Sequence, residues 1–301
     1  QLITLVGNSP APEINGVGTD SIYVGYRGLG QVVHGAGNLN AGSKTVYLGC
    51  EAGSDGSYTL SNGAVTIGDL IVGAFGRGLF HQSGGTVTVN NTLVVGHSSA
   101  DINNKYEQLG GACIVKGKLQ IGLVAGSKGS FELVGGTLSA PKAVVGVGGS
   151  GTVDHYCGTH TVSGDLILGQ LSGSTGTYNI YSAGSVSVGG RGYLGYYSGS
   201  TGTATVTGAG STWTNSSDLH VGYYGSGTLN ITAGGQVSNT YGIIGFLSGS
   251  TGTATVTGTG SKWTNSNNLC VGNSGGGTLN IEAGGQVSST YGNIVGDTSV
   301  A

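Results

Sequence analysis

A motif of two hydrophobic residues that flank one other residue and precede a glycine recurs along the chain every 23 to 27 residues. Repetition at a nearly constant period indicates a stack of equivalent structural units, and a period of about 25 residues suits one turn of a β-solenoid. The motif ends at Gly25, Gly49, Gly73, Gly96, Gly122, Gly146, Gly169, Gly195, Gly222, Gly245, Gly272 and Gly296, and its first hydrophobic position is replaced by Gly192, Gly242 and Asn293 in three of these copies.

One repeat, residues 227–245, shows how a turn is built. Leu229 and Ile231 alternate with polar residues, which predicts a half-buried strand. Gly234 and Gly235 then form a bend, Val237 opens a second strand, and the glycine motif forms a third. We therefore expect an all-β fold, a parallel β-helix of about twelve turns with three short strands each. It should form one domain over residues 21–301, preceded by a separate segment, 1–20.

Two stretches of the chain, residues 199–240 and 249–290, match at 32 of 42 positions. The alternating hydrophobic residues are unchanged between them, as expected for a core constrained by packing. The differences include Asp218 to Asn268 and His220 to Cys270, which alternation assigns to the outside. We therefore expect a constant interior and a variable surface.

Composition supports a repetitive, exported protein. The 301 residues include 65 glycines, yet hydrophobic residues still make up 37% and alternate regularly, which argues against disorder. The net charge is −3 and the ten Lys and Arg are scattered, so we expect no nucleic-acid partner.

The sequence contains no run of about eighteen apolar residues, so we expect no transmembrane helix. A chain that starts at Gln1 is typical of a mature secreted protein, so we expect an extracellular or bacterial cell-surface location.

The string GTATVTGAGSTWTNSSDLHVGYYGSGTLNITAGGQV resembles repeats of the passenger domains of type V autotransporters and of PEP-CTERM-associated proteins. The resemblance extends over about residues 170–296. It implies a right-handed β-helix exported to the bacterial surface or matrix, with a structural or adhesive role. The sequence shows neither a translocator barrel nor a sorting tail, so these were removed or export follows another route.

Catalysis on a β-helix requires converging carboxylates, either to bind Ca²⁺ or to act as acid and base. Asp165 and Asp218 occupy the same position two turns apart, but Arg191 should lie between them. This pattern favours a surface ladder of alternating charge. We expect no catalytic residues, and a polysaccharide lyase or hydrolase is the least favoured function.

His155, Cys157 and His160 form the densest group of residues that bind metals. They are weak candidates for a Zn²⁺ or Cu site, because no fourth ligand accompanies them. Both histidines replace inward leucines of the preceding turn, so hydrogen-bonded core histidines are the favoured alternative. We expect no metal and no cofactor. The four cysteines are too far apart for intrachain disulfides, and Cys270 should be exposed.

Two surface features could bind a partner. Aromatic residues follow the motif glycine in three successive turns, and they suit either glycan or protein binding or a packed row that stiffens the rod. A second candidate is the insertion at residues 98–107. Thr201, Thr203 and Thr205 recur at 251, 253 and 255, as in ice-binding proteins, but two copies do not predict a continuous array. The aromatic candidates are Tyr196, Tyr197, Tyr223, Tyr224 and Phe246.

The two ends of a solenoid expose unpaired strand edges. The apolar run Leu2, Ile3, Leu5 and Val6 could cap its own rod or complete a neighbour, and Ile294 and Val295 form a further turn without a cap. The leading functional hypothesis is therefore a secreted structural protein that assembles with itself, head to tail or laterally, into a fibre, sheath or matrix. The alternative is a cell-surface adhesin that binds glycan or a host surface.

Overall fold

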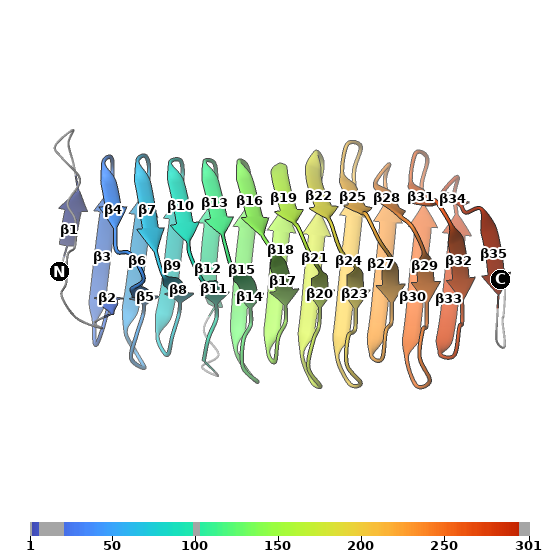
Figure 1. The fold of residues 1–301 in the computed structure, drawn as a ribbon, viewed down its shortest axis with the longest axis horizontal. Helices are drawn as coiled ribbons and strands as arrows, with labels where there is room; N and C mark the ends of the chain where they lie inside the picture. Colours follow the sequence, from blue (N-terminus) through green and yellow to red (C-terminus); the bar gives the residue numbers. More distant parts are fainter. Residues whose placement is uncertain (1, 6–20, 99–102, 295–301) are drawn as a thin grey trace.

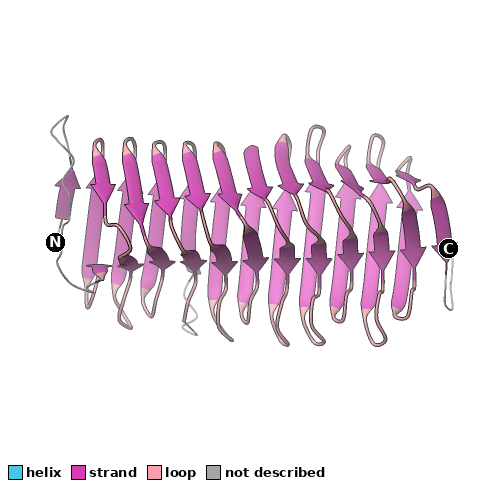
Figure 2. Cartoon of the chain, viewed as in Figure 1, coloured by secondary structure: helices cyan, strands magenta, loops and turns pink. Residues whose placement is uncertain are grey.

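The computed structural model describes residues 2–5, 21–98 and 103–294, which form a rod of stacked solenoid turns with β1 and β35 at opposite ends (Figure 1). All regular elements in these residues are strands (Figure 2). They lie in three parallel sheets, which we call A, B and C. The predicted β-solenoid is therefore confirmed.

Sheet A contains the longest strands: β1 (Leu2–Leu5), β3 (Leu29–His34), β6 (Asp55–Leu60), β9 (Arg77–Gln82), β12 (Asn103–Gln108), β15 (Lys128–Leu133), β18 (Ser150–His155), β21 (Thr175–Ile180), β24 (Thr201–Thr207), β27 (Ser226–Thr232), β30 (Thr251–Thr257) and β33 (Gly276–Glu282). Sheet B contains β4 (Asn38–Asn40), β7 (Ala64–Ile67), β10 (Thr86–Val89), β13 (Ala112–Val115), β16 (Thr137–Ala140), β19 (Gly158–Val162), β22 (Gly184–Val188), β25 (Thr212–Asn215), β28 (Gln236–Asn239), β31 (Lys262–Asn265) and β34 (Gln286–Ser288). Sheet C contains β2 (Ile22–Val24), β5 (Thr45–Leu48), β8 (Asp69–Val72), β11 (Thr92–Val95), β14 (Lys118–Ile121), β17 (Lys142–Val145), β20 (Leu166–Leu168), β23 (Gly192–Leu194), β26 (Leu219–Val221), β29 (Gly242–Ile244), β32 (Asn268–Val271) and β35 (Tyr291–Ile294).

The first eleven glycine motifs map to sheet C, whose twelfth strand, β35, contains the start of the last motif, and the described residues from β3 to β35 form eleven complete turns. Two details of the sequence analysis are wrong. Residues 103–107 belong to the regular strand β12, whose buried Tyr106 pairs with Phe80, so they are not an insertion. In the last turn Ile294 pairs with Val271, so Ile294 takes the position expected for Val295, which lies outside the described residues.

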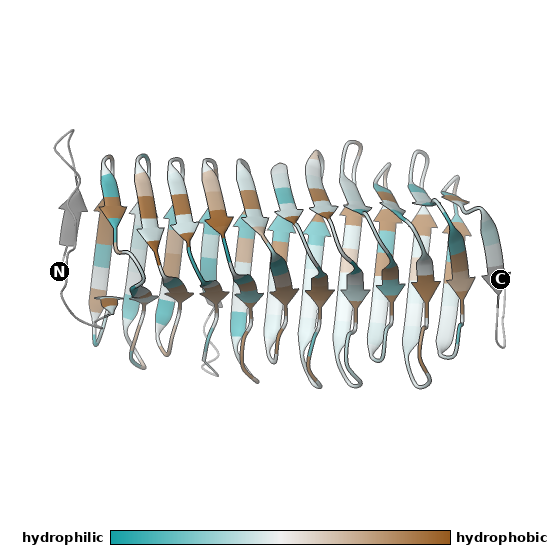
Figure 3. Ribbon diagram, viewed as in Figure 1, coloured by the Kyte–Doolittle hydropathy of each residue, from teal (hydrophilic) through white to brown (hydrophobic). Residues whose placement is uncertain are grey.

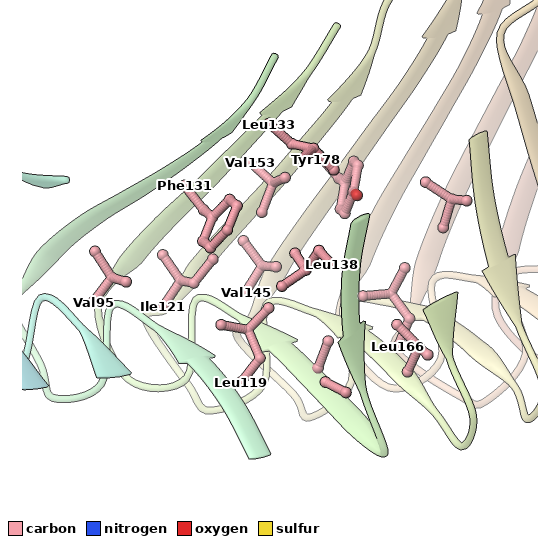
Figure 4. Packing of buried hydrophobic residues seen from close by; sticks show 14 of the residues in the cluster. Val95, Leu119, Ile121, Phe131, Leu133, Leu138, Val145, Val153, Leu166 and Tyr178 are labelled. Atoms are coloured by element: carbon pink, nitrogen blue, oxygen red, sulfur yellow. The ribbon is translucent and has the colours of Figure 1, made fainter. Parts of the chain in front are cut away.

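The interior is a continuous hydrophobic core to which all three sheets contribute (Figure 4). Hydrophobic and polar positions alternate along the long strands of sheet A, as the banding in Figure 3 shows, and these strands bury every second side chain. Several strands of sheet C bury three successive residues instead. Parallel pairing without a shift places like residues above one another. A buried aromatic stack of Tyr58, Phe80, Tyr106 and Phe131 results, with successive ring centroids 4.6 to 5.0 Å apart.

The motif glycine forms the corner at which sheet C leads into the next strand of sheet A. Gly222 has φ +80°, and a Cβ atom there would lie 2.3 Å from the carbonyl oxygen of Thr251 in the next turn. Gly227, near the start of β27, faces the same corner, since its Cβ would lie 2.1 Å from the Gly222 nitrogen. The backbones of two turns therefore pack directly against each other at this corner. Only glycine allows both the positive φ and the close backbone contact.

The N-terminal strand β1 pairs with β3 of the same chain, with Leu2 opposite Gln31 and Leu5 opposite His34. Of the two roles considered for Leu2, Ile3 and Leu5, the structure shows the strand adding to its own rod. Val6 lies outside the described residues. The β1 strand covers the edge of sheet A alone, because the terminal strands of sheets B and C are β4 and β2.

Gly222→Ala should lower the free energy of unfolding by at least about 2 kcal/mol, because the methyl group adds a backbone clash to a strained φ. Urea denaturation followed by circular dichroism measures the change. Gly28→Ala is the matched control, since no atom lies within 4 Å of its added Cβ and its φ is ordinary. Its stability should stay within about 0.5 kcal/mol of the wild type. Equal losses in the two variants would contradict the corner argument.

Candidate functional site

Aromatic side chains gather on the outer face of sheet C. Tyr196, Tyr223 and Phe246 follow the motif glycine in consecutive turns, and their rings stack with centroids 5.3 Å apart at each step. They cover Tyr193 and His220, whose strand positions point outward. His220 is only 4% exposed, so the expected outward position is correct, but its expected solvent exposure is wrong.

Two further tyrosines stand at right angles to this row. Tyr197 packs edge-on against Tyr196 at 4.7 Å, and Tyr224 packs against Tyr223 in the same way at 5.0 Å. They are 47% and 44% exposed, respectively. Three of the five aromatic candidates therefore form a packed row, and two remain open to solvent.

An open groove of 490 Å³ lies beside the row, at β26 and β29. Aromatic and aliphatic side chains form one part of its lining, and an ion pair forms another. The lining residues are Arg191, Ser217, Asp218, His220, Tyr223, Tyr241, Ile243 and Phe246. We call this the aromatic groove.

The ion pair joins Arg191 and Asp218, with 3.1 Å between Nε and Oδ2. Asp165 accepts a hydrogen bond from the Arg191 backbone N–H at 2.9 Å. Arg191 therefore lies between the two aspartates, which confirms the expected charge ladder. Because the guanidinium and Asp218 carboxylate are paired, they present a fixed set of donors and acceptors at the groove rather than a free acid.

His220 adds an imidazole to the groove. Its Nδ1 is buried without a hydrogen-bond partner, and its Nε2 lies 3.9 Å from Oδ2 of Asp218. Burial, and secondarily the charge of Arg191, lowers the pKa of His220 to about 4. The ring is therefore neutral at pH 7. A neutral imidazole, an Arg–Asp pair and aromatic faces together suit a ligand with both apolar faces and hydroxyl groups.

The other group of predicted site residues lies in the core. His155 and His160 both contact the Tyr178 hydroxyl, at 3.3 and 2.8 Å. His155 Nε2 lies 3.1 Å from the carbonyl oxygen of Gly158, so it donates there and Nδ1 is an acceptor. The consistent assignment has the Tyr178 hydroxyl donating to His155 and accepting from Nδ1–H of His160. These are hydrogen-bonded core histidines.

Cys157 does not join the two histidines. Its side chain is exposed, and its Sγ lies 3.6 Å from the carbonyl oxygen of Ser182. Within the part of the chain that the structure describes, no group of three or more His, Cys, Asp and Glu could hold a metal ion. All four cysteines are free thiols, and Cys270 is partly buried rather than exposed.

Sequence reasoning missed a row of carboxylates on the outer face of sheet A. Glu107, Glu132 and Asp154 pair across three consecutive turns. Lys105 bonds both Glu107, at 3.0 Å, and Glu132, and His81 bonds Glu107. The acidic residues were compared only at one position of sheet C. Alignment of the sheet A strands would have revealed the row, in which Lys105 pairs with two of the three carboxylates.

Comparison with family models, curated proteins and solved structures finds no match. In residues 2–5, 21–98 and 103–294 no helix is long and apolar enough to cross a bilayer.

The buried histidines should make the protein less stable in acid. Burial, with a smaller effect from His155, lowers the pKa of His160 to about 3, and burial also lowers that of His155. The unfolded state, in which the histidines have their usual pKa of about 6.5, therefore binds more protons than the folded state as the pH falls below that value. Stability is greatest above pH 6.5 and declines toward the lowered pKa of His160. Each histidine contributes a slope of up to about 1.4 kcal/mol per pH unit. Urea denaturation at pH 7, 5.5 and 4.5 should show a smaller loss for His160→Leu than for the wild type, and equal losses would contradict the assignment.

Proposed function

We propose that the chain is the β-solenoid of an exported, non-catalytic surface protein that binds glycan in the aromatic groove. The observation that carries the proposal is the groove itself, where Tyr223 and Phe246 lie beside the Arg191–Asp218 pair. Sugar rings have apolar faces, which stack on aromatic rings, and hydroxyl edges, which bond planar charged groups. The resemblance to autotransporter passenger repeats supports the same cell-surface role.

The stacked architecture also supports a binding role for the rod. The aromatic row is built on one sheet whose strands are held above and below by continuous parallel ladders, so its residues are positioned by rigid elements. The row covers three turns, with ring spacings of 5.3 Å. A linear glycan lying along the rod would contact successive turns, and each contact would add to its affinity.

Phe246→Ala should lower glycan affinity by about tenfold, because it removes one stacking face. Binding is measured on an oligosaccharide array and then by calorimetry with the best ligand. The matched control is Tyr26→Ala, which removes an exposed aromatic from the same place after a motif glycine at the far end of the rod. Arg191→Gln should weaken binding by removing the ion pair. If Phe246→Ala and Tyr26→Ala bind the ligand as well as the wild type does, the groove is not the site.

We propose end-to-end assembly as a second function, on the evidence of the last complete turn. Ile281 pairs with the fully buried Val256 and so occupies an inward position, yet it is 51% exposed. Leu279 and Val287 of the same turn are only partly buried. Among the described strands, β33, β34 and β35 are the last of their sheets. An apolar surface on these strands favours addition of another strand layer, and a second copy of the solenoid would supply one.

Ile281→Lys should reduce assembly, because a charge would replace an apolar contact at the end of the stack. Sedimentation velocity over a range of concentrations, with electron microscopy of the same samples, measures the size distribution. Leu171→Lys is the control, since Leu171 is 45% exposed on the side of the rod. Wild-type protein that remains monomeric at every concentration would refute this second function.

A further inference from the structure

The outer face of sheet A carries an unbroken column of threonines. Each residue pairs with the next across the sheet, so the column continues over six consecutive turns. Its members are Thr152, Thr177, Thr203, Thr228, Thr253 and Thr278. The two near-identical copies contribute only two of these threonines each. The sequence expectation that no continuous array forms is therefore wrong, because the neighbouring turns supply the missing rows.

Further columns of short polar residues run parallel to this one. Thr201, Ser226 and Thr251 stack on one side, and Thr205, Asn230 and Thr255 stack on the other. Rows are about 4.8 Å apart along the rod, and alternate residues within a strand are about 6.6 Å apart. The result is a two-dimensional grid across β21, β24, β27 and β30, which we call the threonine face.

The chemistry of this face differs from the rest of sheet A. The outward positions of β21 to β30 contain no charged residue, whereas β6 to β18 carry the ion pairs of Asp55, Arg77, Lys105, Glu107 and Glu132. Each threonine presents one methyl and one hydroxyl group on a side chain that is stiff at χ1. Side-chain hydrogen bonds also link neighbouring turns, as between Thr232 and Thr207 at 2.8 Å. The groups are therefore held at fixed spacings.

A surface that repeats in two directions fits a ligand that also repeats in two directions. The outward positions of these four strands carry neither charged nor aromatic side chains, since Tyr178 of β21 is buried. The absence of charge disfavours an ionic ligand, and the absence of exposed aromatic rings disfavours sugar rings. The lack of large side chains on the threonine face also disfavours a second copy of the chain as the ligand, because the centres of protein interfaces are enriched in aromatic, Met and Arg side chains. Water orders around methyl groups and hydrogen-bonds to hydroxyls, so a regular grid of both holds a regular layer of water.

We propose that the threonine face binds ice. Methyl groups would hold water molecules in a fixed layer, hydroxyls would anchor that layer, and the layer would merge with the lattice of an ice crystal. The site lies on sheet A, apart from the aromatic groove on sheet C, and it does not depend on glycan binding.

The test is adsorption of the full chain to ice. Fluorescently labelled protein is allowed to partition into a slowly growing ice hemisphere, and inhibition of ice recrystallisation is measured in parallel. The wild type should enter the ice, and Thr228→Lys should reduce its uptake by about tenfold, because a long charged side chain at the centre would hold the lattice away. Thr161→Lys is the matched control on the exposed face of sheet B, and it should adsorb like the wild type.

Two further variants complete the test. Thr228→Val keeps the shape of the side chain and should fold, and its uptake should fall between those of the wild type and Thr228→Lys. Phe246→Ala should adsorb fully, because it changes only the aromatic groove. The proposal is overturned if the wild type is excluded from ice, or if Thr228→Lys and Thr161→Lys adsorb equally.

Two other occupants of the threonine face are tested with the same variant. If the wild type is a dimer that Thr228→Lys dissociates, the face binds a second copy of the chain. If Thr228→Lys abolishes binding of the wild type to crystalline cellulose, the face binds a polysaccharide. Either result overturns the proposal.

Discussion

The fold depends on a backbone contact at one corner of each turn. Gly222 and Gly227 bring two chain segments so close that no side chain fits between them. The height of a turn is the hydrogen-bonded spacing of parallel strands, about 4.8 Å. The corner fits within that height only without a side chain, because the carbonyl oxygen of the next turn lies where a Cβ atom would be. With the height fixed, parallel ladders form without a shift in register, and like residues stack on like. The aromatic row, the charged row and the threonine face all follow from this stacking.

Much of this architecture could be predicted from the sequence. Alternation identified the inward residues, and the glycine period located the strands of sheet C. The register of His155 on Leu133 and of His160 on Leu138 was also correct. These features depend on local pattern and on a repeat that aligns with itself, so they need no knowledge of the finished surface.

The features that escaped prediction arise between turns. His220 is buried because aromatic rings from neighbouring turns cover it. The alternation of residues within one strand gives no information about side chains from other turns. Glu107 and Glu132 are separated in sequence by a full turn and were not aligned with each other. The threonine face was missed because Thr203 and Thr253 were compared with each other across a gap of two turns, and Thr228, which pairs with both in the turn between them, was not aligned with either. Surface columns become visible only when every strand of one sheet is aligned.

The hydrogen bonds from Tyr178 to His155 and His160 help to fix which turns stack on one another during folding. Neighbouring turns are so alike that a rod could close with one turn displaced, and most hydrophobic contacts would survive the displacement. A displaced stack would set Tyr178 opposite a turn that lacks His155, leaving buried polar atoms without partners. Tyr58 with His34 and Tyr106 with Gln82 form buried polar pairs at equivalent positions of sheet A. Several such pairs along the rod together distinguish the native alignment from displaced ones.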